Sequence, residues 1–192
     1  RKIFHYCKAG YVGTLDTLAS GFLPIALGKS TKTIKYLSDF DKEYVFEVTW
    51  GMDSSTGDLE ADVKSINKIY PSLDEIRSTL TNFIGDYHQA PHKFSAKKVN
   101  GKRAYQFARK NIKVNLKKEK KRILDLKIIN RVSRSKTLLY TKCSSGTYIR
   151  SLVEDIAKAL NTFAVVSSLR RVGFGNLDKK LISLDYLLSL VH

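Results

Sequence analysis

Cysteine and long apolar runs are both scarce in this sequence of 192 residues. The two cysteines, Cys7 and Cys143, show no CxxC spacing, so we expect two reduced thiols rather than a disulfide framework. No stretch approaches the roughly 18 consecutive apolar residues that a membrane-spanning helix needs. The opening segment RKIFHYCKAG is polar and has no initiator methionine. We therefore expect no signal peptide, a cytoplasmic location, no membrane partner, and a native chain that begins upstream.

Three common types of catalytic motif are also absent. GKST at 28–31 ends like a phosphate-binding P-loop, but the glycine that the loop needs five residues earlier is replaced by Leu23. His88 and His92 are separated by the helix breaker Pro91, and no third histidine or cysteine is close in sequence. No Gly-x-Ser-x-Gly elbow occurs. Nucleotide hydrolysis, a zinc site and serine-type hydrolysis are therefore not expected.

Positive charge is abundant and concentrated in one segment. Lysine and arginine total 34 against 18 acidic residues, a formal net charge of +16. Residues 93–136 hold 17 of these basic residues and 2 acidic ones, so the rest of the chain is nearly neutral. Such a segment binds a polyanion or forms a solvated basic face. The interleaved rings of Phe94, Tyr105 and Phe107 favour nucleic acid, although they can also pack against the core.

Hydrophobic periodicity predicts an α+β fold around a mixed, mostly antiparallel sheet flanked by helices, in a single domain over residues 1–192. Strands are expected at 22–28 (buried), 43–50, 122–132, 137–145 and 163–175, with 122–132 and 137–145 forming a hairpin. Helices are expected at 30–40, 71–85, 102–111, 146–160 and 183–191, with Ser30, Ser72 and Ser183 as N-caps. Residues 51–63 read as a polar loop, and 89–101 as a loop with an edge strand.

An isolated carboxylate, Asp16, stands inside the glycine-bounded segment GYVGTLDTLASG. An aspartate in a loop is usually a turn former that bonds its own backbone. Two other segments favour a chemical role: SSGTYIRSL places Arg150 at the start of a helix, and STGDLEAD holds a second loop carboxylate, Asp58. An arginine close to Asp16 would keep it ionised and oriented. The residues thus indicate a nucleophilic or electrostatic carboxylate in a basic RNA cleft.

Several segments together resemble the TruB-type tRNA pseudouridine synthases. They follow one another in the family's order along nearly the whole chain: GTLDTLASGFLPIALGKSTK, DKEYVFEVTWG, TGD, APHKFSAKKVNGKRAYQFARK, CSSGTYIRSL and LRRVGFG. The related dyskerin-type, guide-RNA-dependent enzymes share the loop, but LDPKVTG would be expected there in place of LDTLASG. The resemblance implies the pseudouridine-synthase fold and conversion of uridine-55 in the tRNA T-loop to pseudouridine, without metal, cofactor or ATP.

The resemblance also assigns roles to individual residues. Asp16 becomes the catalytic carboxylate, which acts at the sugar C1′ by attack or elimination, or at uracil C6. Tyr44 stacks on the flipped base and is placed to help remove the C5 proton, and Arg150 pairs with Asp16. The substrate pocket is expected to comprise Tyr148, Leu169, Asp58 and Tyr11, with Asp58 also holding Arg150. Residues 89–117 form an insertion that grips the T-stem backbone through Lys97, Lys98, Lys102, Arg103 and Arg109.

Three positions depart from the family's pattern. Tyr11 stands where many members carry a histidine, Thr17 replaces a proline, and Phe94 replaces a tyrosine. The resemblance implies that the histidine stacks in the space left by the flipped base, which a tyrosine ring can also do. The alternative to an active, monomeric synthase is a catalytically weakened tRNA-binding or folding chaperone of the same fold.

Overall fold

A six-stranded sheet forms the centre of the protein in the computed structural model, which describes residues 4–99, 101–110, 112–177 and 181–189. Every neighbouring pair of strands is antiparallel except β2 and β12, which are parallel. This confirms the predicted mixed, mostly antiparallel sheet. The strands run in the order β2 (Ala19–Gly21), β12 (Ala164–Phe174), β4 (Lys42–Trp50), β11 (Lys136–Cys143), β10 (Glu119–Ser133) and β7 (Gly85–Gln89).

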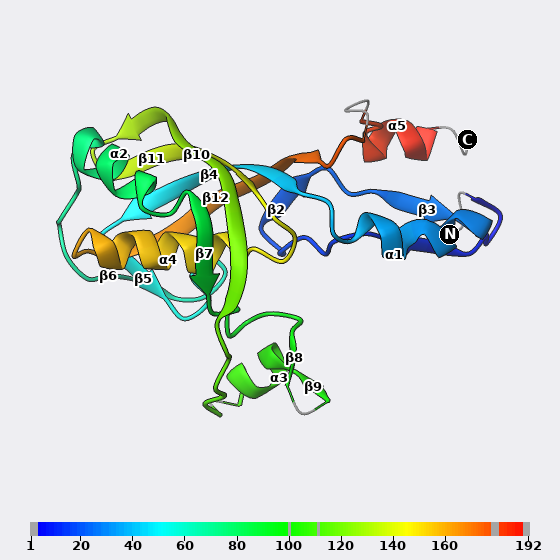
Figure 1. The fold of residues 1–192 in the computed structure, drawn as a ribbon, viewed down its shortest axis with the longest axis horizontal. Helices are drawn as coiled ribbons and strands as arrows, with labels where there is room; N and C mark the ends of the chain where they lie inside the picture. Colours follow the sequence, from blue (N-terminus) through cyan, green and yellow to red (C-terminus); the bar gives the residue numbers. More distant parts are fainter. Residues whose placement is uncertain (1–3, 100, 111, 178–180, 190–192) are drawn as a thin grey trace.

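Period-two alternation buries one face of the central strands. Phe46, Val48 and Trp50 on β4 are each at most 1% exposed, as expected when every second side chain points into a core. Two helices, α2 (Leu73–Thr81) and α4 (Ile149–Ala159), contribute buried residues to the same cluster and contact β10 and β12 respectively. Figure 1 shows both helices lying against the sheet.

The predicted helix at 71–85 begins where its capping residues indicate. Ser72 accepts a hydrogen bond from the Glu75 N–H, and the Glu75 carboxylate accepts one from the Ser72 N–H, so both ends of the capping box are made. The helix stops at Thr81, four residues earlier than expected, and Gly85 instead starts β7 with φ +96°. The predicted hairpin of β10 and β11 is confirmed, with Ser133 opposite Lys136.

The N-terminal segment differs most from the sequence expectation. The strand expected to be buried at 22–28 is the three-residue β3 (Ile25–Leu27), which pairs with β1 (Ala9–Tyr11), and Ile25 is 58% exposed. The helix expected at 30–40 is a 3₁₀ turn, η2 (Gly28–Thr33), followed by α1 (Ile34–Leu37), and Ser30 caps neither. β1 and β3 form a separate two-stranded sheet that extends beyond the main sheet (Figure 1). In this arm the strands lie away from the main core, so an apolar sequence does not ensure a buried strand.

Two short hairpins begin in segments that were expected to be loop or edge strand, and the helix expected at 102–111 begins only at residue 104, after a two-residue strand. β5 (Met52–Ser54), inside the predicted polar loop at 51–63, pairs with β6 (Val63–Ser65), which starts at the last residue of that loop. β8 (Lys98–Val99), β9 (Lys102–Arg103) and α3 (Ala104–Ala108) lie between β7 and β10 in the chain, and Figure 1 shows them projecting below the main sheet. α5 (Leu184–Ser189) follows its predicted cap, because the Tyr186 N–H donates to Ser183 Oγ; residues 190 and 191 of the expected helix lie outside the described part. No described helix is long and apolar enough to cross a membrane.

Candidate active site

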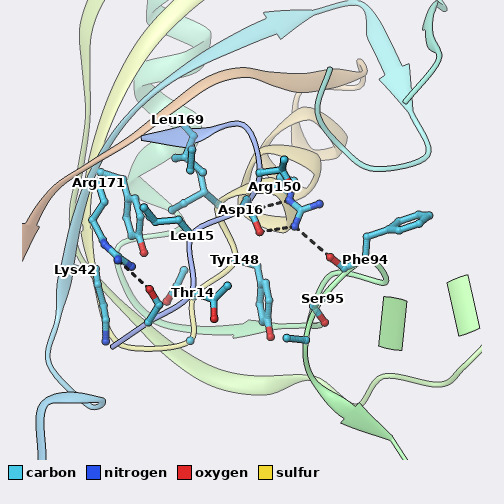
Figure 2. Close-up of a pocket in the computed structure, with 18 of the residues that line it drawn as sticks. Thr14, Leu15, Asp16, Lys42, Phe94, Ser95, Tyr148, Arg150, Leu169 and Arg171 are labelled. Carbon is cyan, nitrogen blue, oxygen red and sulfur yellow. Dashed lines mark hydrogen bonds and ion pairs between the residues drawn. The ribbon is translucent and has the colours of Figure 1, made fainter. Parts of the chain in front are cut away.

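A cavity of about 740 Å³ opens where the loop before β2, strand β4, the start of α4 and the root of the insertion meet. Figure 2 shows Asp16 and Arg150 facing each other, with Tyr148 and Leu169 nearby. The lining combines charged, hydroxyl and aromatic side chains. They include Thr14, Asp16, Lys42, Tyr44, Ser95, Tyr105, Arg109, Tyr148, Arg150, Leu169 and Arg171.

Asp16 and Arg150 form a bidentate ion pair. Arg150 Nε donates to Asp16 Oδ2 at 2.8 Å, and Nη2 donates to Oδ1 at 2.7 Å. This two-point geometry fixes the plane of the carboxylate as well as its position. The Arg150 side chain is 5% exposed, whereas that of Asp16 is 35% exposed. The arginine is therefore buried behind the carboxylate, and the carboxylate faces the cavity.

The remaining donors of Arg150 are held by the chain around it. Nη1 donates to the Thr56 carbonyl at 2.9 Å and lies 3.3 Å from Asp58 Oδ2, while Nη2 also donates to the Phe94 carbonyl at 3.2 Å. Asp58 is fully buried, and its Oδ1 accepts hydrogen bonds from the Thr56 hydroxyl and from the N–H of Glu60. Asp58 thus touches Arg150 as expected, but it lies behind the arginine and does not line the cavity.

Arg171 holds both ends of the loop that carries Asp16. Its Nε donates to the Phe22 carbonyl at 2.6 Å, and its Nη2 donates to the Gly13 carbonyl at 2.9 Å. Arg171 is 1% exposed and lies two residues after Leu169 on β12, so both side chains point to the same face of the sheet. Gly13 has φ +69°, and a Cβ there would lie 3.1 Å from Arg171 Nη1. A glycine therefore allows this close contact.

Tyr44 lies on β4 beside Asp16 and Arg171 in the cavity wall. Burial, reinforced by the nearby Cys143 thiol, raises the pKa of Tyr44 to about 12. The charge of Arg171 opposes this rise without cancelling it. The phenol is therefore neutral at pH 7 and offers a ring face and a hydroxyl to the cavity.

Lys42, two residues before Tyr44 on β4, is a buried cation of the cavity. Its Nζ donates to the Ser38 carbonyl at 2.7 Å and to Ser145 Oγ at 3.0 Å, and the residue is 4% exposed. Burial, together with the charge of Arg171, lowers the pKa of Lys42 to about 8. These bonds join the start of β4 to the two loops that border the cavity.

The expected pocket residues are only partly brought together. Leu169 lines the cavity from β12, and Tyr148 lines it from the N-terminus of α4. Gln89 holds the backbone of Tyr148 through two hydrogen bonds, one to its carbonyl at 3.0 Å and one from its N–H at 2.8 Å. Tyr11 does not line the cavity: it lies on β1 opposite Ile25 and is 57% exposed. β1 carries Tyr11 onto the outer arm, outside the cavity wall, and its part in the substrate pocket stays a prediction.

The expected RNA-binding residues lie at the surface of the insertion. Lys97 forms an ion pair with Glu119, and the guanidinium of Arg103 donates to the Ala96 carbonyl at 2.8 Å. Arg109 lies over the ring of Tyr105, 5.4 Å from its centre, and both residues line the cavity. Lys98 and Lys102 are exposed on the short hairpin of β8 and β9. The basic insertion is thus continuous with the cavity that holds Asp16.

Residues 1–149 match the N-terminal domain of the TruB family of pseudouridylate synthases. The chain belongs to this family. It is similar to tRNA pseudouridine synthase B of Caulobacter vibrioides, with 41% identity over the whole chain and 62% of that protein. With the enzyme of the same name from Rickettsia rickettsii (strain Sheila Smith), identity is 44% over 91% of the chain and 51% of that protein. The chain thus spans about half to three fifths of the length of these relatives.

Solved structures of related proteins share the fold of this TruB-family chain. The crystal structure of a Cbf5–Nop10–Gar1 complex gives a TM-score of 0.70 at 28% identity, covering 96% of this chain and 46% of that one. The structure of an H/ACA RNP bound to a substrate RNA containing 2′-deoxyuridine gives 0.68 at 26% identity, covering 96% and 44%. These likenesses agree with the predicted pseudouridine-synthase fold.

Three buried residues that shape the site were not identified from the sequence of this TruB-family chain: Lys42 and Arg171, which line the cavity, and Gln89, which holds the backbone of Tyr148. A signal for two of them existed, because Lys42 and Arg171 each lie two residues from a predicted site residue on the same strand. Cations are rarely buried, so the pattern alone favours a surface role for them. Among the described residues, no three histidine, cysteine or acidic side chains lie close enough to hold a metal.

Replacing Arg150 with methionine should lower the free energy of unfolding by about 3–5 kcal/mol, because Asp58 would remain buried without its counter-charge. Urea unfolding followed by the fluorescence of Trp50, the chain's one tryptophan, measures this. The double variant Arg150→Met/Asp58→Asn should recover part of the loss, since it removes the unpaired charge. A loss below about 1 kcal/mol in Arg150→Met would contradict the assignment of a buried ion-pair network.

Proposed function

We propose that this chain carries the catalytic site of a tRNA pseudouridine synthase, which isomerises uridine-55 of the T-loop to pseudouridine. The observation that carries the proposal is the Asp16–Arg150 pair: a carboxylate, oriented by a buried arginine, faces a cavity that continues into a basic insertion. Family membership supports the type of reaction. The names of the relatives, tRNA pseudouridine synthase B, support tRNA as the substrate.

In the reaction that we propose, Asp16 acts at C1′ of the flipped nucleotide. Attack by a carboxylate oxygen on C1′ breaks the C1′–N1 bond, and uracil leaves with the electron pair on N1. The uracil rotates, C5 forms the new bond to C1′, and the carboxylate is released. N1 gains a proton and C5 loses one, so the reaction is an isomerisation with no net change in atoms. An elimination at the sugar would use the same carboxylate as its base.

Arg150 leaves Asp16 free to react while holding it in place. Each carboxylate oxygen has two lone-pair directions, and the arginine occupies one on each oxygen. The other directions remain available on the 35% exposed cavity side. Orienting a reactive group before the substrate arrives is an effective source of rate enhancement.

Tyr44, Tyr148 and Leu169 receive the flipped base. Extruding a base from its stack costs a few kcal/mol, and stacking on an aromatic ring returns roughly 1–3 kcal/mol. Tyr44 offers the ring, and its neutral phenol lies beside Asp16 in the cavity wall, in reach of the step in which C5 loses its proton. Leu169 and Tyr148 complete an apolar and aromatic wall against uracil.

The insertion supplies the positive charge that the phosphate backbone needs. Lys98 and Lys102 extend from the hairpin, while Arg109 lies at the cavity edge. Backbone contacts of this kind determine where the RNA lies and leave base recognition to the cavity. We propose that residues 89–117 grip the T-stem and thereby place the T-loop over Asp16.

Asp16→Asn should abolish isomerisation while leaving RNA binding intact, because asparagine keeps the shape but is a poor nucleophile and base. Tritium release from T-arm RNA labelled at C5 of uridine measures the reaction, and filter binding measures affinity. The unchanged chain should release tritium and Asp16→Asn should not. Equal release from both would overturn the assignment of Asp16. RNA binding without release from either would favour the alternative, a tRNA-folding chaperone of the same fold.

Lys102→Ala and Arg103→Ala should each weaken tRNA binding and reduce its dependence on salt. Each lost phosphate contact should lower the slope of log affinity against log salt by about 1. Arg77→Ala is the control, because Arg77 is an exposed cation on α2, which lies at the opposite end of β7 from the insertion in Figure 1. Slopes equal to that of the control in both variants would remove the hairpin from the RNA interface.

A further inference from the structure

His92 is buried at the root of the insertion, three residues after β7 ends. Its residue exposure is 3%, and its Nδ1 accepts a hydrogen bond from the Phe94 N–H at 3.2 Å. A ring nitrogen that accepts carries no proton, so in the neutral ring the proton is on Nε2. Nε2 lies 3.3 Å from Oε1 of Glu154. The hydrogen bond that Nδ1 accepts thus defines one tautomer and one orientation of the ring, and Nε2 lies close to Glu154 without a hydrogen bond to it.

Glu154 presents a negative charge to this ring from α4. Burial raises the pKa of Glu154, but the contact with His92 and the positive charges of Lys158 and Lys93 outweigh it and hold the pKa below its usual value. Glu154 follows Arg150 by four residues on α4, which places the two side chains on one face of the helix. His92 therefore contacts, through Glu154, the same face of α4 that carries Arg150, one helical turn further along.

Phe94 connects His92 directly to Arg150. Its N–H donates to His92 Nδ1, and its carbonyl accepts from Arg150 Nη2 at 3.2 Å. Figure 2 shows this bond from Arg150 to Phe94 beside the bonds from Arg150 to Asp16. The Nη2 atom that holds Asp16 Oδ1 is thus the one oriented by the Phe94 carbonyl. A rotation of the Phe94 backbone would remove that acceptor.

A second contact joins the same groups through Gly57. A Cβ at Gly57 would lie 3.0 Å from Glu154 Oε1, 3.2 Å from His92 Nε2 and 3.4 Å from Arg150 Cβ. The loop that supplies Thr56 and Asp58 to Arg150 is therefore in close contact with the His92–Glu154 pair. His92 is therefore linked to the groups that hold Arg150 in two ways: through Phe94 at the root of the insertion, and through the loop around Gly57.

We propose that His92 is a positioning residue that couples the RNA-gripping insertion to the Asp16–Arg150 pair through the backbone of Phe94. This inference rests on the proposed function. The hydrogen bond to Nδ1 fixes the Phe94 backbone, the Phe94 carbonyl fixes Arg150 Nη2, and Arg150 fixes the carboxylate. Because Phe94 belongs to the insertion, RNA held there acts on the orientation of Asp16 through this chain of contacts.

Two substitutions separate the two nitrogen atoms of His92. His92→Asn places its Oδ1 near the position of Nδ1 and so keeps an acceptor for the Phe94 N–H. His92→Gln places its amide nitrogen near Nε2, keeping a donor for Glu154, but has no acceptor at the Nδ1 position. The two variants share polarity, and each preserves one of the two contacts, which makes them matched controls for each other.

Single-turnover isomerisation of bound T-arm RNA, with affinity measured separately, tests the proposal. His92→Gln should lower the single-turnover rate about tenfold at unchanged affinity, and His92→Asn should stay within about threefold of the original chain. A purely structural role predicts equal losses in both variants that follow their thermal stability. Equal rates in both variants, or a rate loss matched by a loss of affinity, would overturn the proposal.

An NMR measurement keeps this inference separate from the proposed function. The Arg150 Nε–H donates to Asp16 Oδ2 at 2.8 Å, so its proton signal should be shifted downfield and exchange slowly with water. The signal is assigned by its loss in Arg150→Lys. It should persist in His92→Asn and broaden or move toward free arginine in His92→Gln, even if the chain proves inactive on RNA. An identical Arg150 signal in both variants would overturn the coupling while leaving the proposed function untouched.

Discussion

Arg150 carries a charge that is almost entirely removed from water, and the residues of the site supply its counter-charges and hydrogen-bond acceptors. Its side chain is 5% exposed, and it contacts Asp16, Asp58 and the carbonyls of Thr56 and Phe94. A buried charge is tolerated only when it is paired and its donors are bonded. Meeting that demand brings together a glycine-bounded loop, a second acidic loop, the start of α4 and the root of the insertion. The position of Asp16 is a consequence of this arrangement.

The layered fold explains why these distant segments meet. α4 packs on β12, so its first turn lies near the strand that carries Leu169 and Arg171. β2 adds to the edge of β12 in parallel, which brings the preceding loop, with Asp16, to the same place. Arg171 then holds that loop at Gly13 and Phe22. Two arginines therefore act on one loop: Arg171 holds its backbone and Arg150 holds its carboxylate.

Periodicity in the sequence was enough to predict the four inner strands of the sheet and the two helices that pack on it, but not the edge strands β2 and β7. The alternation along β4 and the capping box of Ser72 are local patterns, and both appear in the structure as expected. The outer arm was predicted less well, because the apolar run at 22–28 does not reveal that Ile25 pairs with a lone ribbon and remains exposed. The sequence shows which side chains are apolar, but whether such a side chain is buried depends on which other parts of the folded chain pack against it.

In the candidate site, too, some residues could be predicted from the sequence and others could not. The sequence indicated Asp16, Tyr44 and Arg150, which meet in one cavity. It did not indicate which side of Arg150 Asp58 would occupy, since that depends on how the 55–62 loop folds beneath α4. Lys42 and Arg171 were missed because buried cations contradict the usual distribution of charge, and only their bonds to carbonyls in the folded chain account for them.

The most direct test of the central claim is a crystal structure of the chain bound to a T-arm stem-loop that carries 5-fluorouridine at the target position. The account predicts a flipped nucleotide in the cavity, with its base against Tyr44 and an oxygen of Asp16 bonded to C1′ or within roughly 3–3.5 Å of it, the separation of reacting atoms before attack. A nucleotide bound outside the cavity, or one whose C1′ lies far from Asp16 while Arg150 still holds the carboxylate, would contradict it.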